Sequence, residues 1–330
     1  MSAADLRTDL QSALAEEYTI ERELPRGGMS RVFVAVEEGL QRRVVIKVLS
    51  PELAASLSAE RFKREIAWAA RLQHPHIVPL LSSGQARSHL YYTMPMVDGD
   101  SLRERMNRER PMAFADICRI LEEVAGALAY AHEERIAHRD IKPENIMFFH
   151  GRAVVLDFGI GKALLNSATA ETEILRITQT GMSVGTPMYI APEQARGDAG
   201  LDHRADLYAL GVVAYEMITG HPPFTGKYPS DILEAHANKT AEPILTRRPD
   251  TPRPLADIVT RCLAKSPDDR PATGQAIIDA IAPTVGVPKR AGPSAAVTAP
   301  AALPWWVPWA ITAVSILAAV TMAILYASRS

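Results

Sequence analysis

Four polar residues stand close together in the middle of the sequence. Asp140, Lys142 and Asn145 belong to the run His-Arg-Asp-Ile-Lys-Pro-Glu-Asn, and Asp157 opens an Asp-Phe-Gly triplet after a short strand-like stretch. Carboxylate and amide oxygens are ligands that Mg²⁺ prefers, a carboxylate can accept a proton, and an ammonium group can neutralise an anionic substrate. A turn of hydrogen-bonded polar residues is the alternative, but the order and spacing of the four favour a site that handles charge and protons.

An apolar run upstream carries a lysine that needs a partner. Lys47 ends the run Val-Val-Ile-Lys, whose other members are aliphatic. An unpaired ammonium group is costly in such a setting, and a phosphate together with a carboxylate would compensate it. Glu65, in the helical run 60–72, is the expected carboxylate because it lies on the apolar face of that helix. A solvated helix charge is the alternative interpretation of Glu65.

Two further segments complete a known pattern. Residues 185–193 read Gly-Thr-Pro-Met-Tyr-Ile-Ala-Pro-Glu, residues 206–211 read Asp-Leu-Tyr-Ala-Leu-Gly, and Arg270 follows later. With these segments, the polar loop and the Asp-Phe-Gly triplet, the region 18–282 resembles the eukaryotic-like (Hanks-type) serine/threonine protein kinases of bacteria. Many members of that family are joined by a linker to a single membrane span.

The resemblance implies a role for each polar residue. Asp140 would accept the proton of a substrate hydroxyl, and Lys142 would neutralise charge on the γ-phosphate of ATP. Asp157 and Asn145 would hold Mg²⁺, or Mn²⁺ in its place. Phosphoryl transfer passes through a highly anionic transition state, so positioning and charge neutralisation carry most of the catalysis. The implied catalytic set is Lys47, Glu65, Asp140, Lys142 and Asn145.

The secondary-structure elements that must position these residues fall into two groups, strands first and helices later in the sequence. Short β-branched runs separated by Gly-containing turns predict strands at 18–23, 32–36 and 44–49. A helical stripe of apolar residues is formed by Ile117, Leu121, Val124 and Leu128. Strands followed by helices indicate an α+β protein. The resemblance makes it a bilobal protein-kinase fold, with a small β-rich N-lobe at about 18–95 and a large helical C-lobe at about 98–282.

The glycine-rich loop departs from the family pattern. Pro25 and Ser30 stand where the family has its first and third glycines, and Val45 replaces the usual alanine. Since the N–H groups at the loop tip remain, we expect nucleotide affinity to be altered rather than abolished; taken alone, Gly27-Gly28 could be a plain hairpin turn. The residues expected to contact the nucleotide are Gly27, Gly28, Met29, Ser30, Val32, Val45, Lys47, Met94, Pro95, Val97 and Met147.

The connection between the predicted lobes supplies part of that nucleotide site. By register, Met94 would be the gatekeeper, with the hinge at 95–97. Pro95 keeps its carbonyl oxygen, and Val97 would supply the N–H that adenine needs. An ordinary apolar connection is the alternative.

The segment before residue 185 contains hydroxyl groups and few large apolar residues. Thr178 and Thr180 are the expected phosphorylation sites, which would order this segment through Arg139. The alternative is that these hydroxyls only solubilise a loop. Lys142 and Thr186 are marks of specificity for Ser/Thr rather than Tyr in the family, and Thr186 would contact the substrate.

Composition narrows the function classes. The 330 residues carry 36 Lys plus Arg against 38 Asp plus Glu, a formal net charge of −2, so no basic excess favours nucleic-acid binding. Cys118 and Cys262 are the only cysteines and lie far apart. A disulfide framework and a cysteine-built metal site are therefore excluded, and a reducing compartment is expected.

A charge-free segment follows near the end of the sequence. No charged side chain lies between Arg290 and Arg329, and residues 305–326 are mostly Ala, Val, Ile and Leu, with aromatic residues at both ends. Such a helix can cross about 30 Å of hydrocarbon, and Trp and Tyr gather at membrane interfaces. The sequence predicts one transmembrane helix at 305–326; a buried helix of a soluble domain is the alternative.

The remaining segments complete the expected organisation. Residues 1–17 form an N-terminal extension, residues 283–304 a Pro/Ala-rich flexible linker, and residues 327–330 a tail too short to fold as an outer domain. Lys289 and Arg290 precede the span, which predicts a single-pass protein of the cell membrane with its kinase domain in the cytoplasm.

The favoured interpretation is an active, membrane-anchored Ser/Thr protein kinase that autophosphorylates its activation loop. Its expected partners are protein substrates, the membrane, and a second copy for phosphorylation in trans, with no nucleic acid. A pseudokinase that senses nucleotide or acts as a scaffold is the alternative, which Pro25, Ser30 and Val45 support. A small-molecule phosphotransferase is disfavoured because residues 185–193 resemble a peptide-docking segment.

Overall fold

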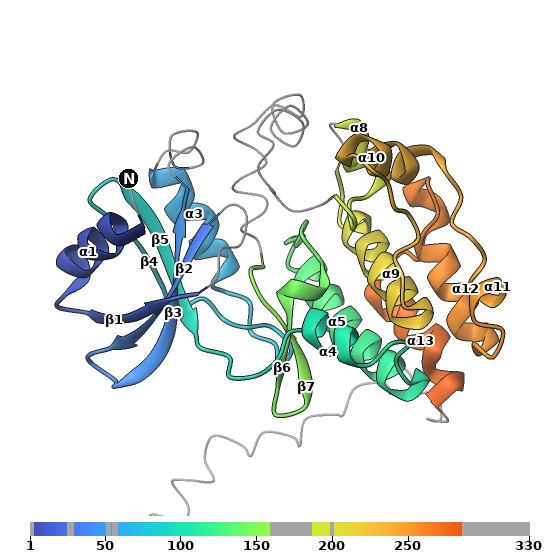
Figure 1. Cartoon of the computed structure of the whole chain (residues 1–330), viewed down its shortest axis with the longest axis horizontal. Helices are drawn as coiled ribbons and strands as arrows, with labels where there is room; N and C mark the ends of the chain where they lie inside the picture. Colours follow the sequence, from blue (N-terminus) through green and yellow to red (C-terminus); the bar gives the residue numbers. More distant parts are fainter. Residues whose placement is uncertain are drawn as a thin grey trace, which may run out of the picture. The chain divides into compact units, whose positions relative to one another are not determined.

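The computed structural model describes residues 3–24, 30–50, 54, 59–158, 187–198 and 201–285 (Figure 1). The chain divides into two compact units, 1–288 and 289–330, and every described residue belongs to the first. None of the helices in these ranges is long and apolar enough to cross a membrane. The predicted span 305–326 lies outside them.

A five-stranded antiparallel sheet forms the first part of the described unit. Its strand order is β1-β2-β3-β5-β4. The strands are β1 (Tyr18–Glu23), β2 (Ser30–Glu37), β3 (Arg42–Leu49), β4 (Ser82–Ala86) and β5 (His89–Pro95). The three predicted strands are present, with β2 and β3 slightly longer than expected. Most of β3 and β5 is buried on both faces, since residues 44–46 and 89–94 are all buried. Each face must therefore be covered.

Helix α1 (Ala3–Leu14) covers one face of the sheet. Leu6, Leu10 and Leu14, spaced four residues apart, are buried in one cluster with strand residues such as Phe33 and Ile46. Polar contacts fix the helix to β1, since Arg7 donates to the Ile20 carbonyl oxygen at 3.2 Å and the Gln11 amide accepts from the Ile20 N–H at 2.7 Å. Residues 3–14 of the N-terminal extension are thus a folded part of the sheet domain.

Helix α3 (Ala59–Ala69) packs against residues of the other sheet face. Phe62 and Ile66 are buried in a second cluster with Val45, Tyr92 and Met94. Because side chains alternate along a strand, neighbouring residues of β5 serve different clusters, and Tyr91 belongs to the cluster under α1. The face that holds Tyr92 is also the face that carries Lys47, its cross-strand partner on β3.

The second part of the unit is helical. Its helices are α4 (Leu102–Arg108), α5 (Phe114–Glu133), α8 (Pro192–Arg196), α9 (Arg204–Thr219), α10 (Pro229–Asn238), α11 (Ile244–Arg247), α12 (Arg253–Cys262) and α13 (Gly274–Val285), with 3₁₀ turns η1 (Pro143–Asn145) and η2 (Pro267–Asp269) and a hairpin of β6 (Ile146–Phe149) and β7 (Arg152–Val155). The predicted stripe on α5 is buried, and α9 is buried along almost its whole length. The expected α+β architecture of a β-rich and a helical lobe is confirmed. The helical lobe extends past the predicted boundary at residue 282, because α13 continues to Val285.

Candidate active site

The loop before β6 brings three of the predicted residues together. Lys142 Nζ donates to Asp140 Oδ2 at 2.7 Å, and Asn145 Nδ2 donates to the carbonyl oxygen of Asp140 at 2.8 Å and to its Oδ2 at 3.0 Å. The short turn η1 sets Asn145 in place for this contact. The Asp140 side chain is 56% exposed, so a group on another protein can reach it.

A buried carboxylate on α9 holds the start of this loop. Asp206 is 1% exposed and accepts the backbone N–H groups of His138 at 2.8 Å and Arg139 at 2.6 Å, with the ring of His132 at 2.8 Å. Arg139 has a φ of 67°, an unfavourable left-handed conformation for a non-glycine residue, and the bond to its N–H helps to maintain it. Burial acts to raise the pKa of Asp206, but the bonds from His132 and the loop backbone hold it below its ordinary value. The sequence singled out the segment 206–211 as part of the family pattern but not this anchoring role.

Asp157 lies where the two lobes meet. Its Oδ2 pairs with the Lys47 ammonium group from β3, and its Oδ1 accepts a 3.0 Å hydrogen bond from Tyr92 Oη on β5. The preceding residue is fixed by the helical lobe, since Leu156 donates its N–H to the Asn145 carbonyl oxygen at 2.9 Å. Burial acts to raise the pKa of Asp157, but the charge of Lys47 and the two side-chain hydrogen bonds hold it below its ordinary value. Asp157 is thus bonded to Lys47 of the sheet lobe, and its neighbour Leu156 is bonded to Asn145 of the helical lobe.

Lys47 pairs in this structure with a carboxylate other than the predicted one. Among the described residues the carboxylate paired with Lys47 is that of Asp157, and Glu65 forms no ion pair within that part of the chain. Glu65 is half-buried on α3. Tyr92, the cross-strand neighbour of Lys47, also binds Asp157, so two adjacent strands hold this carboxylate beside Lys47.

Tyr92 was not among the residues predicted from the sequence. Burial, and then the negative charge of Asp157, raise the pKa of Tyr92 well above its ordinary value, so its hydroxyl group remains a neutral donor. Tyr92 stands two residues before Met94, and side chains two residues apart on a strand share a face. Because an apolar side chain would have been enough to complete the cluster on that face, the hydroxyl group was the sequence signal.

Five residues predicted to contact the nucleotide lie in one apolar cluster at the junction of the lobes. Val45 and Met94 are buried there, with Val32, Val97 and Met147 packed against them. The N–H of Met96 donates to the Arg43 carbonyl oxygen at 3.3 Å, whereas the N–H of Val97 has no partner within the described ranges and is available to a ligand. Pro95 ends β5 and Ser30 opens β2; Gly27, Gly28 and Met29 lie outside the described residues.

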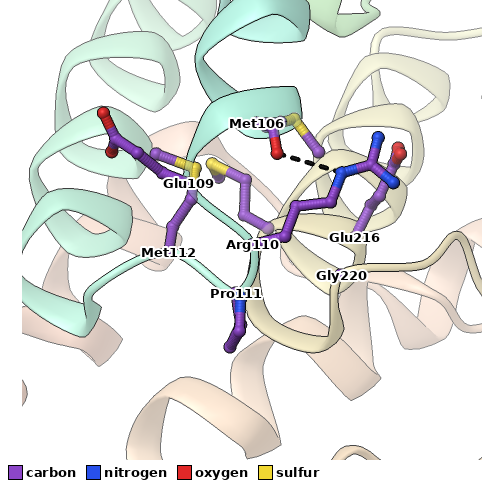
Figure 2. A pocket seen from close by; sticks show the side chains of 8 residues that line it. Met106, Glu109, Arg110, Pro111, Met112, Glu216 and Gly220 are labelled. Carbon is purple, nitrogen blue, oxygen red and sulfur yellow. Dashed lines mark hydrogen bonds between the residues drawn. The ribbon is translucent and has the colours of Figure 1, made fainter.

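A hollow beneath α4 is separate from these residues (Figure 2). It encloses almost no space even for a water-sized group, whereas small-molecule sites usually enclose roughly 300 Å³ or more. Arg110 Nε donates to the Met106 carbonyl oxygen across it at 3.0 Å. Its lining residues are Met106, Glu109, Arg110, Pro111, Met112, Glu216, Met217 and Gly220. The hollow is too small for a nucleotide.

The segment that ends in α8 is pinned to the helical lobe at two points. Arg270 is fully buried and binds Glu193 through two hydrogen bonds of 2.7 Å. Tyr189 Oη donates to Glu216 at 2.5 Å, and Arg103 NH1 binds the same carboxylate at 2.7 Å. The sequence singled out Arg270 but gave no sign of the contacts of Arg103 and Tyr189. Thr178, Thr180 and Thr186 lie outside the described residues.

With this geometry established, the class of protein follows. Residues 18–280 match the family model of the protein kinase domain, and the chain belongs to that family. The two-lobed fold, with a β-sheet lobe and a helical lobe, is therefore the protein-kinase fold, as the sequence indicated.

Individual relatives agree with this assignment. The chain is 39% identical over 265 residues to serine/threonine-protein kinase PknB of Mycobacterium tuberculosis, covering 78% of this chain and 41% of the relative. It is 38% identical over 285 residues to serine/threonine-protein kinase pkn3 of Myxococcus xanthus, covering 84% of this chain and 51% of the relative. The chain thus spans about half or less of the length of these relatives.

A solved structure supports the fold. The crystal structure of Rad53 1-466 in complex with AMP-PNP superimposes with a TM-score of 0.67 at 21% identity, covering 82% of this chain and 66% of that chain. At this identity the similarity concerns the fold alone.

Proposed function

We propose that this chain is an active serine/threonine protein kinase that transfers the γ-phosphate of ATP to Ser and Thr hydroxyl groups of proteins. The observation that carries the proposal is the ion pair of Lys47 with Asp157 between the two lobes, together with the bond of Asn145 to the exposed carboxylate of Asp140. The family assignment and the names of the relatives support the same activity.

The donor groups fit a divalent cation. Asp157 keeps a low pKa and is therefore ionised at neutral pH. Asn145 uses its Nδ2 for both bonds to Asp140, which leaves its Oδ1 free of partners within the described ranges and able to face a cation. Asp157 and Asn145 would hold Mg²⁺ or Mn²⁺, which supplies positive charge against the triphosphate.

Residues of the chain would accept the proton, neutralise the phosphates and bind the nucleotide. Asp140 engages Lys142 and Asn145 through Oδ2, and within the described part of the chain its Oδ1 has no partner, so it could accept the proton of a substrate hydroxyl. Lys142 would neutralise charge on the transferred phosphate. Lys47 would leave Asp157 to bind the other phosphates, with Glu65 as the partner carboxylate that the sequence predicts. Adenine would lie against Val32, Val45 and Met147, at the edge of the apolar cluster, and accept from the N–H of Val97.

The direct test compares Asp140→Asn with the unchanged protein. Incubation with radiolabelled ATP and a basic protein substrate should show labelling of Ser and Thr, reduced about 10²- to 10⁴-fold by the substitution. Asp257→Asn, an exposed site on α12, is the matched control and should label normally. Equal labelling by Asp140→Asn and the control would reject the mechanism. Complete absence of labelling in the unchanged protein, with nucleotide still bound, would favour the pseudokinase that Pro25, Ser30 and Val45 suggest.

We further propose that phosphorylation at Thr178 or Thr180 orders the activation loop through Arg139. The support is that Arg139 Nε is buried without a hydrogen-bond partner among the described residues, so an anion would satisfy it. Phosphorylation in trans by a second copy is proposed with it, and Thr186 is proposed to contact the substrate. Mass spectrometry after incubation with ATP should find phosphate at these positions, including on an Asp140→Asn copy mixed with active protein. A loop that stays unmodified while substrates are labelled would end this proposal.

We also propose that residues 305–326 anchor the protein in the cell membrane with the kinase domain in the cytoplasm. The support is the charge-free apolar sequence with aromatic residues at its ends. Replacing both Ile316 and Leu317 with Arg should move the full chain from the membrane fraction to the soluble fraction, since each charge costs about 2.5–3.5 kcal/mol at the centre of a span. Unchanged fractionation would contradict the anchor.

A further inference from the structure

The hydroxyl group of Tyr92 is buried where packing alone does not require it. Tyr92 is 4% exposed and lies among apolar side chains that include Val45, Phe62 and Met94. A phenylalanine would fill the same space without a hydroxyl, whose burial without a hydrogen bond costs about 1–3 kcal/mol. Within the described ranges the partner of this hydroxyl is Asp157 Oδ1, at 3.0 Å.

The pairing of β3 with β5 places the contact of Tyr92 with Asp157 next to the contact of Lys47 with Asp157. Lys47 and Tyr92 are directly paired across β3 and β5, so their side chains emerge next to each other on one face of the sheet. They divide the carboxylate of Asp157 between them, because Lys47 contacts Oδ2 and Tyr92 contacts Oδ1. Two donors fixed on neighbouring strands define the rotation of that carboxylate.

Residues of the helical lobe hold the backbone next to Asp157. Leu156 donates its N–H to Asn145, and its carbonyl oxygen is 2.7 Å from the ring nitrogen Nε2 of His138. Asp157 itself has a φ of 64°, a left-handed conformation that needs support from its surroundings. With the main chain fixed in this way, rotation of the carboxylate is the freedom that remains for the side chain.

The two donors differ in what they do to a cation. Lys47 carries a positive charge, which repels a metal ion, and in the proposed reaction it moves to the phosphates. Tyr92 is neutral and lies within the packed sheet, so it can keep its bond to Oδ1 while Oδ2 turns to a metal. Outer groups that orient a metal ligand in this way commonly change metal affinity about 10- to 100-fold when they are removed.

We propose that Tyr92 is a positioning residue that orients the Asp157 carboxylate for the divalent metal ion bound with the nucleotide. The inference rests on the proposed role of Asp157 as a metal ligand. Tyr92 touches neither nucleotide nor substrate in this scheme and acts through Asp157 alone.

The experiment measures metal binding rather than activity. The full chain, purified in detergent, is titrated with Mg²⁺ at a fixed concentration of a fluorescent ATP analogue, and nucleotide binding is also measured in EDTA. Tyr92→Phe should weaken the apparent Mg²⁺ affinity by about 10-fold or more, while binding in EDTA stays unchanged. Tyr91→Phe is the matched control, because it removes a hydroxyl from the preceding residue of β5, in the cluster under α1, and should match the unchanged protein.

The other outcomes of the Mg²⁺ titration would overturn the proposed role of Tyr92. Equal Mg²⁺ affinity in Tyr92→Phe and the control would overturn the role of Tyr92 and leave the proposed kinase function intact. Tighter Mg²⁺ binding would overturn it as well, since the hydroxyl would then oppose the metal. Nucleotide binding by the unchanged protein that does not depend on metal would overturn both the metal role of Asp157 and this inference. Thermal unfolding checks the variants, and Tyr92→Met, which also lacks the hydroxyl, serves if Tyr92→Phe is unfolded.

Discussion

Replacing Arg270 with methionine should be among the most damaging single changes in the helical lobe. The guanidinium group is fully buried and its two terminal nitrogens each bind one oxygen of Glu193 at 2.7 Å. The same group also donates to the carbonyl oxygens of Ala264, Arg204 and Lys265, at 2.9, 3.1 and 3.1 Å. Methionine fills much of the volume but leaves a carboxylate, 7% exposed, with no cation beside it.

The magnitude follows from the uncompensated charge. Removing one partner of a buried ion pair costs about 3–5 kcal/mol of unfolding free energy. For a domain of this size each kcal/mol lowers the melting temperature by about 2–4 °C, so Arg270→Met should melt roughly 6–20 °C below the unchanged protein. Losing the link at Glu193 should also loosen the segment that ends in α8.

The assay is denaturant unfolding followed by circular dichroism. Arg261→Met, an exposed arginine on α12, is the control and should change the unfolding free energy by less than about 0.5 kcal/mol. Adding Glu193→Leu to Arg270→Met removes the stranded charge, so the double variant should be more stable than Arg270→Met alone. A loss below about 1 kcal/mol for Arg270→Met, or a double variant less stable than the single one, would refute the reasoning.

Three further predictions concern other parts of the fold. Leu10→Ala should lower the unfolding free energy by about 2–5 kcal/mol, because it leaves a cavity between α1 and the sheet, and denaturant titration would show it. Gly99→Ala should cost about 1–3 kcal/mol in the same assay, since a Cβ there would lie 2.0 Å from the Phe148 carbonyl oxygen; Gly39→Ala, with open space around it, should cost almost nothing. Burial, and then a neighbouring lysine, lower the pKa of His236 from 6.5 to about 4, so the folded protein keeps this ring neutral where the unfolded chain is protonated. The unfolding free energy should therefore fall as the pH drops from 6.5 to about 4, and a denaturation series should show a flatter dependence for His236→Gln; equal slopes would contradict this.

Local pattern was sufficient for much of the fold. The strand that ends at Lys47 and the buried stripe of α5 could be predicted because a strand and an amphipathic helix each impose a short period on the sequence. The catalytic loop was predictable for a different reason. Asp140, Lys142 and Asn145 lie within a few residues, so their mutual contacts depend mainly on one turn.

Contacts between distant segments were harder to predict. Whether Lys47 pairs with Glu65 or Asp157 depends on where α3 lies relative to the sheet, and periodicity carries no such information. The role of Tyr92 depends on the approach of the helical lobe to β5, which is equally distant in sequence. Helix α1 did leave a signal, since its leucines recur every four residues, and attention to that spacing would have found it.

The position of α1 has a practical consequence for producing the protein. The family match begins at residue 18, and a shortened version cut at that boundary would lack the whole helix. The strand face that carries Phe33, Val44 and Ile46 would then meet solvent, and uncovered apolar surfaces of this kind drive association and aggregation. Protein expressed from residue 18 onward should therefore aggregate, whereas protein expressed from residue 3 onward keeps this apolar face covered by α1.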